Sequence, residues 1–241
     1  MLARFDVAVG ETRRVGGLRT ALRVACTPYL SIALLLRFLE ALRNAEPTVA
    51  VQVTHLFAHD QVRLLGSGDI DLGILRRPDN GSGLELEALF PGEPLAAYLA
   101  RDHHLASKRA LRPDDVRNET LVMFPRIADL GRFDRALTRL EESGYRFGSV
   151  EEAGGMSPRD LLVAVARSRG IAIAPLSLKD VVEVERVAVR RPLASPVFLA
   201  DIVLAVPANP PRQLRPLVAV ARRVARELRQ AAESPLRDGA E

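Results

Sequence analysis

The stretch from Leu64 to Leu75 constrains the fold of this chain more than any other part of the sequence. It reads LLGSGDIDLGIL, which is typical of the end of an amphipathic helix, a glycine stop and a short buried strand. Gly66 or Gly68 can adopt the left-handed conformation that follows a last helical turn. Asp69 and Asp71 then precede an apolar run of the kind found in parallel strands covered on both faces. The stretch therefore predicts a helix–turn–strand unit within an α/β sheet.

The same alternation of strands and helices continues along the chain. Strands are expected at residues 22–25, 49–55, 71–75, 84–89, 95–100, 120–124, 145–151, 171–175, 187–189 and 202–206. Helices are expected at residues 30–45, 58–65, 129–143, 158–167 and 214–232. Ser157 and Asp160 predict a capping box at the start of the fourth of these helices. Strands that alternate with helices predict an α/β fold with right-handed crossovers.

The cysteine content and the hydropathy of the chain bear on its compartment. A single cysteine, Cys26, excludes a disulfide within the chain and agrees with a reducing cytosol. Residues 1–17 lack the continuous apolar core of a secretory signal, and no apolar run reaches the roughly 20 residues of a membrane helix. We expect a cytoplasmic protein without membrane contact, in which Cys26 is a small buried side chain rather than a redox sensor.

The net charge of +4 comes almost entirely from arginines spread along the chain. Only the last expected helix carries a basic face, formed by Arg215, Arg222, Arg223, Arg226 and Arg229. A solvated helix surface is the expected role of this face, with a nucleic-acid patch as the alternative.

Several motifs together resemble the effector-binding domain of LysR-type transcriptional regulators. They are LLGSGDIDLGIL, DHHLA at residues 102–106, LVMFP at residues 121–125 and LVAVARSRGIAIAP at residues 162–175. The resemblance covers roughly residues 19–232. Ser168 stands where the family usually has a glycine, so we expect a left-handed helix cap there to be strained or rebuilt.

The resemblance implies an α/β fold of two Rossmann-like lobes joined by two crossing strands, as in type 2 periplasmic binding proteins. Ligand would bind between the lobes, and hinge closure is the expected response. The crossing strands would be residues 96–100 and 202–205. The expected parts are a leader or linker remnant (1–19), subdomain I (20–97 and 205–232), subdomain II (98–204) and a tail (233–241).

The resemblance also bears on partners. The winged helix-turn-helix of the family is absent before residue 19, so DNA contact is expected only through such a domain outside this chain. The helix at residues 30–45 is apolar over more than one face, and in the family it packs on a subdomain II helix of a second subunit. Here that helix would be 129–143, which carries Phe133, Leu137 and Leu140. A homodimer or a higher homo-oligomer is therefore expected.

The turn that opens the first helix is the leading candidate for ligand binding. Free backbone N–H groups and the helix dipole suit an anion at Thr27-Pro28, and the hydroxyls of Thr27 and Ser31 add donors. The family's corresponding turn contacts effector carboxylates. Simple helix capping is the alternative.

Further candidates lie at the ends of other strands. Arg126, after Pro125, could pair with a carboxylate across the cleft, although an exposed surface position is the commoner fate of a lone arginine. Arg76 follows a buried strand at the end where open α/β sheets place ligands. Ala174 and Pro175 end a strand of the second lobe and are expected to form part of the cleft wall.

No sequence motif indicates catalysis or a cofactor. The four histidines (His55, His59, His103 and His104) form no Cys/His cluster, and nucleotide and hydrolase motifs are missing, so no metal and no cofactor is expected. We expect a non-enzymatic sensor that binds a small anionic metabolite to control transcription. A solute-binding receptor of a transporter and an enzyme on the same bilobal fold are the alternatives. The first is disfavoured by the missing export signal, and the second by the missing acid/base set.

Overall fold

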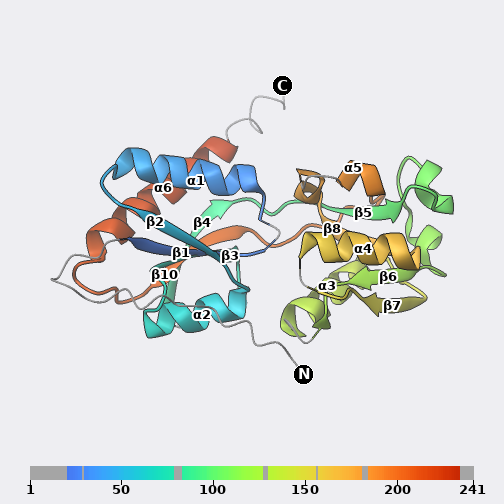
Figure 1. Ribbon diagram of the computed structural model, residues 1–241, viewed down its shortest axis with the longest axis horizontal. Coiled ribbons are helices and arrows are strands. Elements are labelled where there is room, and N and C mark those ends of the chain that lie inside the picture. Colours follow the sequence, from blue (N-terminus) through green and yellow to red (C-terminus); the bar gives the residue numbers. More distant parts are fainter. Residues whose placement is uncertain are drawn as a thin grey trace.

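The strands of the protein form two separate sheets. The computed structural model describes residues 21–28, 30–78, 83–126, 130–155, 157–180 and 184–233. The two five-stranded sheets have the orders β2-β1-β3-β10-β4 and β7-β6-β8-β5-β9. We call the part built on the first sheet lobe I and the part built on the second sheet lobe II; the two lie side by side along the long axis (Figure 1). Within the described ranges, no helix is both long enough and apolar enough to cross a membrane.

Lobe I is a sheet with helices on both faces. Its elements are β1 (Leu22–Cys26), α1 (Ile32–Ala45), β2 (Val51–His55), α2 (Ala58–Ser67), β3 (Leu72–Arg76), β4 (Leu84–Phe90), β10 (Ile202–Pro207) and α6 (Arg215–Glu233). Along β1, Val24 and Cys26 pack with the residues of α1 and α6, whereas Ala25 packs with Leu65 of α2. Burial on both faces explains the continuous apolar runs of the central strands.

Lobe II has the same layered plan. Its strands are β5 (Leu95–Ala100), β6 (Thr120–Met123), β7 (Ser149–Glu152), β8 (Ile171–Pro175) and β9 (Ala188–Pro192). Its helices are η1 (His104–Ser107), η2 (Pro113–Val116), α3 (Leu130–Glu142), α4 (Pro158–Ser168), η4 (Leu176–Asp180) and α5 (Val184–Val187). Phe133 and Leu140 of α3 are buried in this lobe's own core beside Leu121. The expectation that they face a second subunit is therefore wrong, because their apolar surface is already covered.

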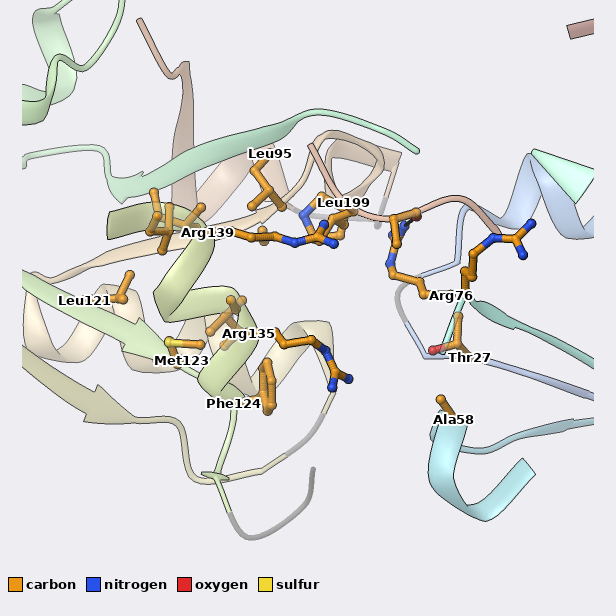
Figure 2. A pocket seen from close by; sticks show the side chains of 18 of the residues that line it. Thr27, Ala58, Arg76, Leu95, Leu121, Met123, Phe124, Arg135, Arg139 and Leu199 are labelled. Carbon is orange, nitrogen blue, oxygen red and sulfur yellow. Dashed lines mark hydrogen bonds between the residues drawn. The ribbon is translucent and has the colours of Figure 1, made fainter. Parts of the chain in front are cut away.

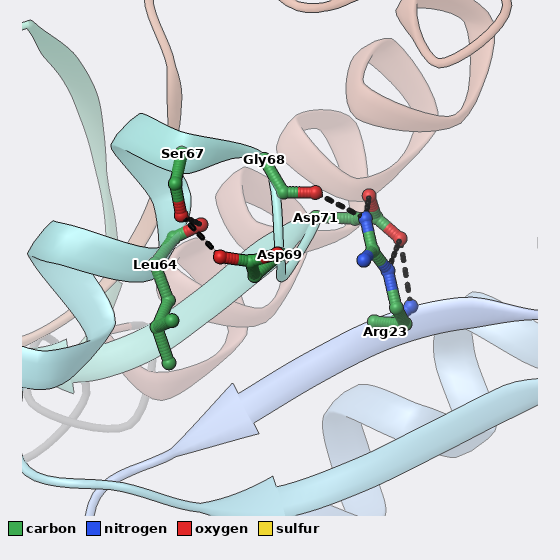
Figure 3. A network of polar contacts seen from close by, with 6 residues as sticks. All are labelled: Arg23, Leu64, Ser67, Gly68, Asp69 and Asp71. Carbon is green, nitrogen blue, oxygen red and sulfur yellow. Dashed lines mark hydrogen bonds and ion pairs between the residues drawn. The ribbon is translucent and has the colours of Figure 1, made fainter. Parts of the chain in front are cut away.

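The helix–turn–strand unit predicted at Leu64–Leu75 is confirmed. Helix α2 ends at Gly68, which takes the left-handed conformation with φ of 76°. Asp71 is 1 % exposed, and its carboxylate accepts hydrogen bonds from the backbone N–H of Arg23 at 2.9 Å and from its guanidinium Nη2 at 2.9 Å (Figure 3). The same guanidinium donates to the Gly68 carbonyl at 2.6 Å. This network ties the end of α2 and the start of β3 to β1.

Two local expectations differ from the structure. The expected crossing strands each lie within one sheet, since β5 lies between β8 and β9, and β10 lies between β3 and β4. The lobes are joined instead by residues 91–94 and 198–201, and the subdomain boundaries stay a prediction. Strand β7 begins at Ser149 rather than 145, because the Tyr145 hydroxyl is bonded to the Leu111 carbonyl at 2.9 Å. The expectation of a strained or rebuilt cap at Ser168 is confirmed, because the left-handed residue at the end of α4 is Arg169, with φ of 56°.

The capping box at Ser157 and Asp160 is confirmed, with Asp160 N–H donating to the Ser157 hydroxyl at 3.1 Å. At the other end of α4, the Ser168 hydroxyl accepts the Gly170 N–H at 3.2 Å. A side-chain cap thus replaces the family's glycine at this position.

Three of the five arginines on the basic face of α6 form ion pairs within lobe I and the crossing segment. Arg222 pairs with Glu85, and Arg226 with Glu87 at 2.9 Å. Arg229 reaches Asp201 at 3.1 Å. These contacts give the arginines a structural role in holding α6 against β4, which supports the solvated-surface interpretation over a nucleic-acid patch.

Candidate functional site

A pocket lies between the two lobes and is the candidate ligand site. Its cavity volume is about 130 Å³, which suits a compact small molecule. Lobe I contributes the carboxyl ends of β1 and β3 and the start of α2, in the form of Thr27, Ala58, Arg76, Arg77 and Pro78. Lobe II and the second crossing segment contribute the remaining wall, which is mostly apolar: Leu95, Leu121, Val122, Met123, Phe124, Arg135, Ala136, Arg139, Leu140, Leu161, Ile173, Ala174, Pro175, Leu199 and Ala200.

The hydroxyls of Thr27 and Ser31 lie on the lobe I side. Thr27 is 4 % exposed and Ser31 is 8 % exposed, and no hydrogen bond of either hydroxyl is found among the residues that the structure describes. The fully buried side-chain atoms without a partner in the described chain are Gln61 Oε1 and Arg191 Nε, so the Thr27 and Ser31 hydroxyls are not buried orphans. Ser31 is the N-cap of α1 but makes no side-chain capping bond. The first turn of α1 therefore keeps N–H groups available. A ligand that accepts from such a hydroxyl takes the place of water in the pocket, so the hydroxyl can contribute to affinity and specificity.

Four arginines supply the positive charge of the pocket. Arg135 and Arg139 extend from α3 toward lobe I (Figure 2), and Arg139 donates to the Phe198 carbonyl at 2.9 Å. No ion pair of Arg139 or Arg77 is found in the described part of the chain. Arg76 is instead paired with Glu93 at 2.8 Å. Burial lowers the pKa of the Arg76 guanidinium, Glu93 raises this pKa, and the charge of Arg139 lowers it further.

The structure brings some of the predicted site residues together and leaves others outside. Thr27, Arg76, Ala174 and Pro175 line the pocket, whereas Pro28, Ser31, Pro125 and Arg126 are not among its lining residues. Arg126 is bound in a two-bond contact to Asp134 of α3, from Nε to Oδ1 at 3.0 Å and from Nη2 to Oδ2 at 3.0 Å. Its pKa is raised by this hydrogen-bonded carboxylate. Arg126 thus lies exposed on the surface of lobe II.

Sequence reasoning missed the arginines of α3. Arg135 and Arg139 are four residues apart, so they project from one side of the helix. On a strongly amphipathic helix such residues are normally interpreted as a solvent-exposed face. The sequence alone does not show that lobe I lies opposite this face. The signal that could have identified them is the four-residue spacing of two arginines on a helix that follows a strand ending at the cleft.

His103, His104 and Glu119 form a cluster that could be taken for a metal site. The Nε2 atoms of the two histidines lie 3.3 Å and 3.1 Å from the Glu119 carboxylate. However, Nδ1 of the buried His103 accepts the Leu105 N–H at 3.1 Å, so the ring proton sits on Nε2, the atom that would face a metal. Burial lowers the pKa of His103, which keeps the ring neutral. In this geometry the two imidazoles contact the Glu119 carboxylate directly and hold it in place, and we assign no metal to the cluster.

Cys26 lies next to Thr27 but is fully buried. Burial raises the pKa of its thiol to about 11. At neutral pH only about one molecule in ten thousand then carries the reactive thiolate.

Comparison with known proteins gives the family. The model described as LysR substrate binding domain matches residues 16–230. The chain is 34% identical over 107 residues to the HTH-type transcriptional regulator MetR of Salmonella typhimurium, which covers 44% of this chain and 33% of that relative. It is 26% identical over 137 residues to the HTH-type transcriptional regulator AlsR of Bacillus subtilis, covering 57% and 44% of the two chains. The matched part thus spans about a third to under half of these curated relatives.

Solved structures agree on the fold. The BenM effector binding domain with its effector benzoate superposes with a TM-score of 0.70 at 19% identity, covering 88% of this chain and 94% of that one. The reduced form of the OxyR regulatory domain from Pseudomonas aeruginosa gives a TM-score of 0.67 at 19% identity, covering 86% and 95%. At this level of identity the likeness concerns the architecture.

Proposed function

Because the chain belongs to the LysR substrate-binding domain family, the effector-sensing part of LysR-type transcriptional regulators, we propose that it binds a small anionic effector in the interlobe pocket. The observation that carries the proposal is Thr27, which lines the pocket, is 4 % exposed as a residue and makes no side-chain hydrogen bond within the described chain, so its hydroxyl is available to a ligand. The Arg139 guanidinium adds a positive charge on the facing wall and has no ion pair within the described ranges. An anion is the ligand class that uses both.

The two walls favour an effector with an apolar body and a charged end. Lobe II offers Leu95, Met123, Phe124 and Ile173, which exclude water from the ligand's body. Arg76, Ala174 and Pro175 border the same space and are proposed to contact the effector. The lining has no carboxylate, histidine or cysteine among the described residues, which speaks against acid/base chemistry and for binding alone.

We further propose that binding is relayed through contacts between copies of the chain to DNA-binding domains. Helix α1 supports this step, because Ile32 is 63% exposed and Leu36 is 49% exposed on its outer face. Large apolar side chains are seldom left in water as neighbours on one helix face. The proposed occupant is a second copy of the chain.

A thermal-shift screen of small carboxylates tests the pocket, followed by calorimetric titration of the best hit. The hit stabilises the folded chain by mass action. Thr27→Val keeps the shape of the side chain but removes the hydroxyl, and we expect the affinity to fall by roughly 1 to 3 kcal/mol.

Thr138→Val is the matched control, because the Thr138 hydroxyl is exposed and donates only to the Asp134 carbonyl at 3.0 Å within α3. Equal affinities of wild type and Thr27→Val exclude Thr27 from the site. A hit that is insensitive to Thr27→Val, Ser31→Ala and Arg139→Gln alike binds somewhere other than the interlobe pocket.

A further inference from the structure

The two segments that join the lobes run side by side in opposite directions. Pro94 and Phe198 form an antiparallel bridge. On either side of it, Leu95 N–H donates to the Val197 carbonyl at 2.8 Å, and Leu199 N–H donates to the Glu93 carbonyl at 3.0 Å. Any movement of one lobe relative to the other must act through this short ladder.

Asp201 fastens both crossing segments to lobe I. Its Oδ1 accepts the Gly92 N–H at 2.8 Å, and its Oδ2 accepts from Arg229 of α6 at 3.1 Å. Its carbonyl accepts the Arg77 N–H at 2.8 Å. These bonds link both segments to the end of β3 and to α6, so this part of the crossing moves with lobe I.

Glu93 is the group that reaches across to lobe II. Its Oε1 accepts from Arg76 Nη2 at 2.8 Å, and its Oε2 accepts the N–H of Ser177 in η4 at 3.0 Å. Arg76 also donates from Nη1 to the Ala200 carbonyl at 3.2 Å. The side chains of Arg76 and Glu93 are only 13% and 19% exposed, so water replaces these bonds poorly if they break.

We propose that Arg76, Glu93 and Ser177 form an interlobe latch that sets the relative orientation of the lobes. One carboxylate holds a cation at the end of β3 in lobe I and a backbone N–H of lobe II, so rotation of lobe II stretches one of its two contacts. Arg76 lines the pocket, which places the latch beside the ligand. The latch rests on the proposed function only in that effector binding is the event that moves it.

Glu93→Gln tests the latch with the smallest change of shape. The amide has one oxygen for two donors, and its NH₂ group is turned toward either Arg76 or the Ser177 N–H, so one contact is lost. Glu151→Gln is the matched control, because Glu151 pairs with Arg167 at 3.0 Å within lobe II and spans no lobe boundary. Both variants are compared with wild type as the full chain without ligand.

Two measurements report on the latch. Spin labels at Arg63→Cys in α2 and Val163→Cys in α4, both at exposed positions and away from the outer face of α1, give the interlobe distance distribution by electron resonance, while the buried Cys26 stays unlabelled. Hydrogen exchange of the Ser177 amide gives the strength of the lobe II contact. We expect Glu93→Gln to shift or broaden the distribution and to speed this exchange on the order of tenfold, with Glu151→Gln matching wild type.

An unchanged distribution and unchanged exchange in a folded Glu93→Gln chain would overturn the latch. If circular dichroism shows that this variant does not fold, Arg76→Lys replaces it. A single ammonium does not span the Glu93 carboxylate and the Ala200 carbonyl together, and the same two changes are expected. Because both measurements use the chain without ligand, their outcome is independent of whether a carboxylate effector is found.

Discussion

The buried carboxylate of Asp71 is the most sensitive single group of lobe I that we identify. Asp71→Ala removes the acceptor of the Arg23 backbone N–H at 2.9 Å and of its guanidinium at 2.9 Å. The backbone N–H of Arg23, near the start of β1, is then left without its partner. The Arg23 side chain is 32% exposed and can form hydrogen bonds with water instead. An orphaned N–H costs about 1 to 3 kcal/mol, and a lost charge-assisted bond discounted for exposure adds about 1 kcal/mol. We expect a loss of about 2 to 4 kcal/mol in the free energy of unfolding.

Asp69→Ala provides the internal control for this prediction. Asp69 is exposed, and its carboxylate accepts a hydrogen bond from the Ser67 hydroxyl at 2.5 Å (Figure 3). Loss of such a surface contact changes stability by about 0.5 kcal/mol or less. Urea denaturation followed by circular dichroism measures both variants. A difference of less than about 0.5 kcal/mol between them would refute the assignment of Asp71 as the anchor of β3 to β1.

Three further outcomes follow from the packing. Cys26 should not react with a disulfide reagent at pH 8 in the folded chain, because burial raises the pKa of its thiol to about 11. Since the thiol of the unfolded chain ionises near pH 9.0, the free energy of unfolding should fall by about 2 to 3 kcal/mol as the pH rises from 9 to 11, and Cys26→Ala should lack this fall. Gly92→Ala should destabilise the chain by about 2 kcal/mol or more because a Cβ there meets the Leu199 carbonyl, whereas Gly66→Ala in α2 has free space and should be neutral or stabilising in the same urea assay. Leu36→Glu on α1 should convert the proposed dimer to a monomer near 26.4 kDa in light scattering. The same mass for the variant as for wild type would contradict the α1 interface.

The features predicted correctly from sequence are those with local causes. The Gly68 turn after α2 and the Ser157 capping box depend on residues within one turn of each other, and both are confirmed. The predicted bounds of the strand Ile171–Pro175 are confirmed, because a short apolar run between Gly170 and Pro175 is long enough for a strand and too short for a helix.

The features that sequence reasoning missed depend on distant partners. Tyr145 was placed in a strand by its β propensity, but its hydroxyl reaches Leu111 and accepts the Ser195 N–H at 2.9 Å, contacts from residues far along the chain. Local sequence assigns the wrong position to both Arg126 and Arg139: the first, at a strand end, is held by Asp134 on the surface, and the second, on an amphipathic helix, lines the pocket. Only the packing of one lobe against the other separates these two roles.

A crystal structure of the chain with the best-binding small carboxylate tests the central claim most directly. We predict the carboxylate between the lobes, within hydrogen-bond distance of the Thr27 hydroxyl and facing Arg139, with its apolar part against Met123 and Phe124. A carboxylate bound outside the pocket, or one that contacts lobe II alone and leaves the Thr27 hydroxyl without a partner, would contradict the account.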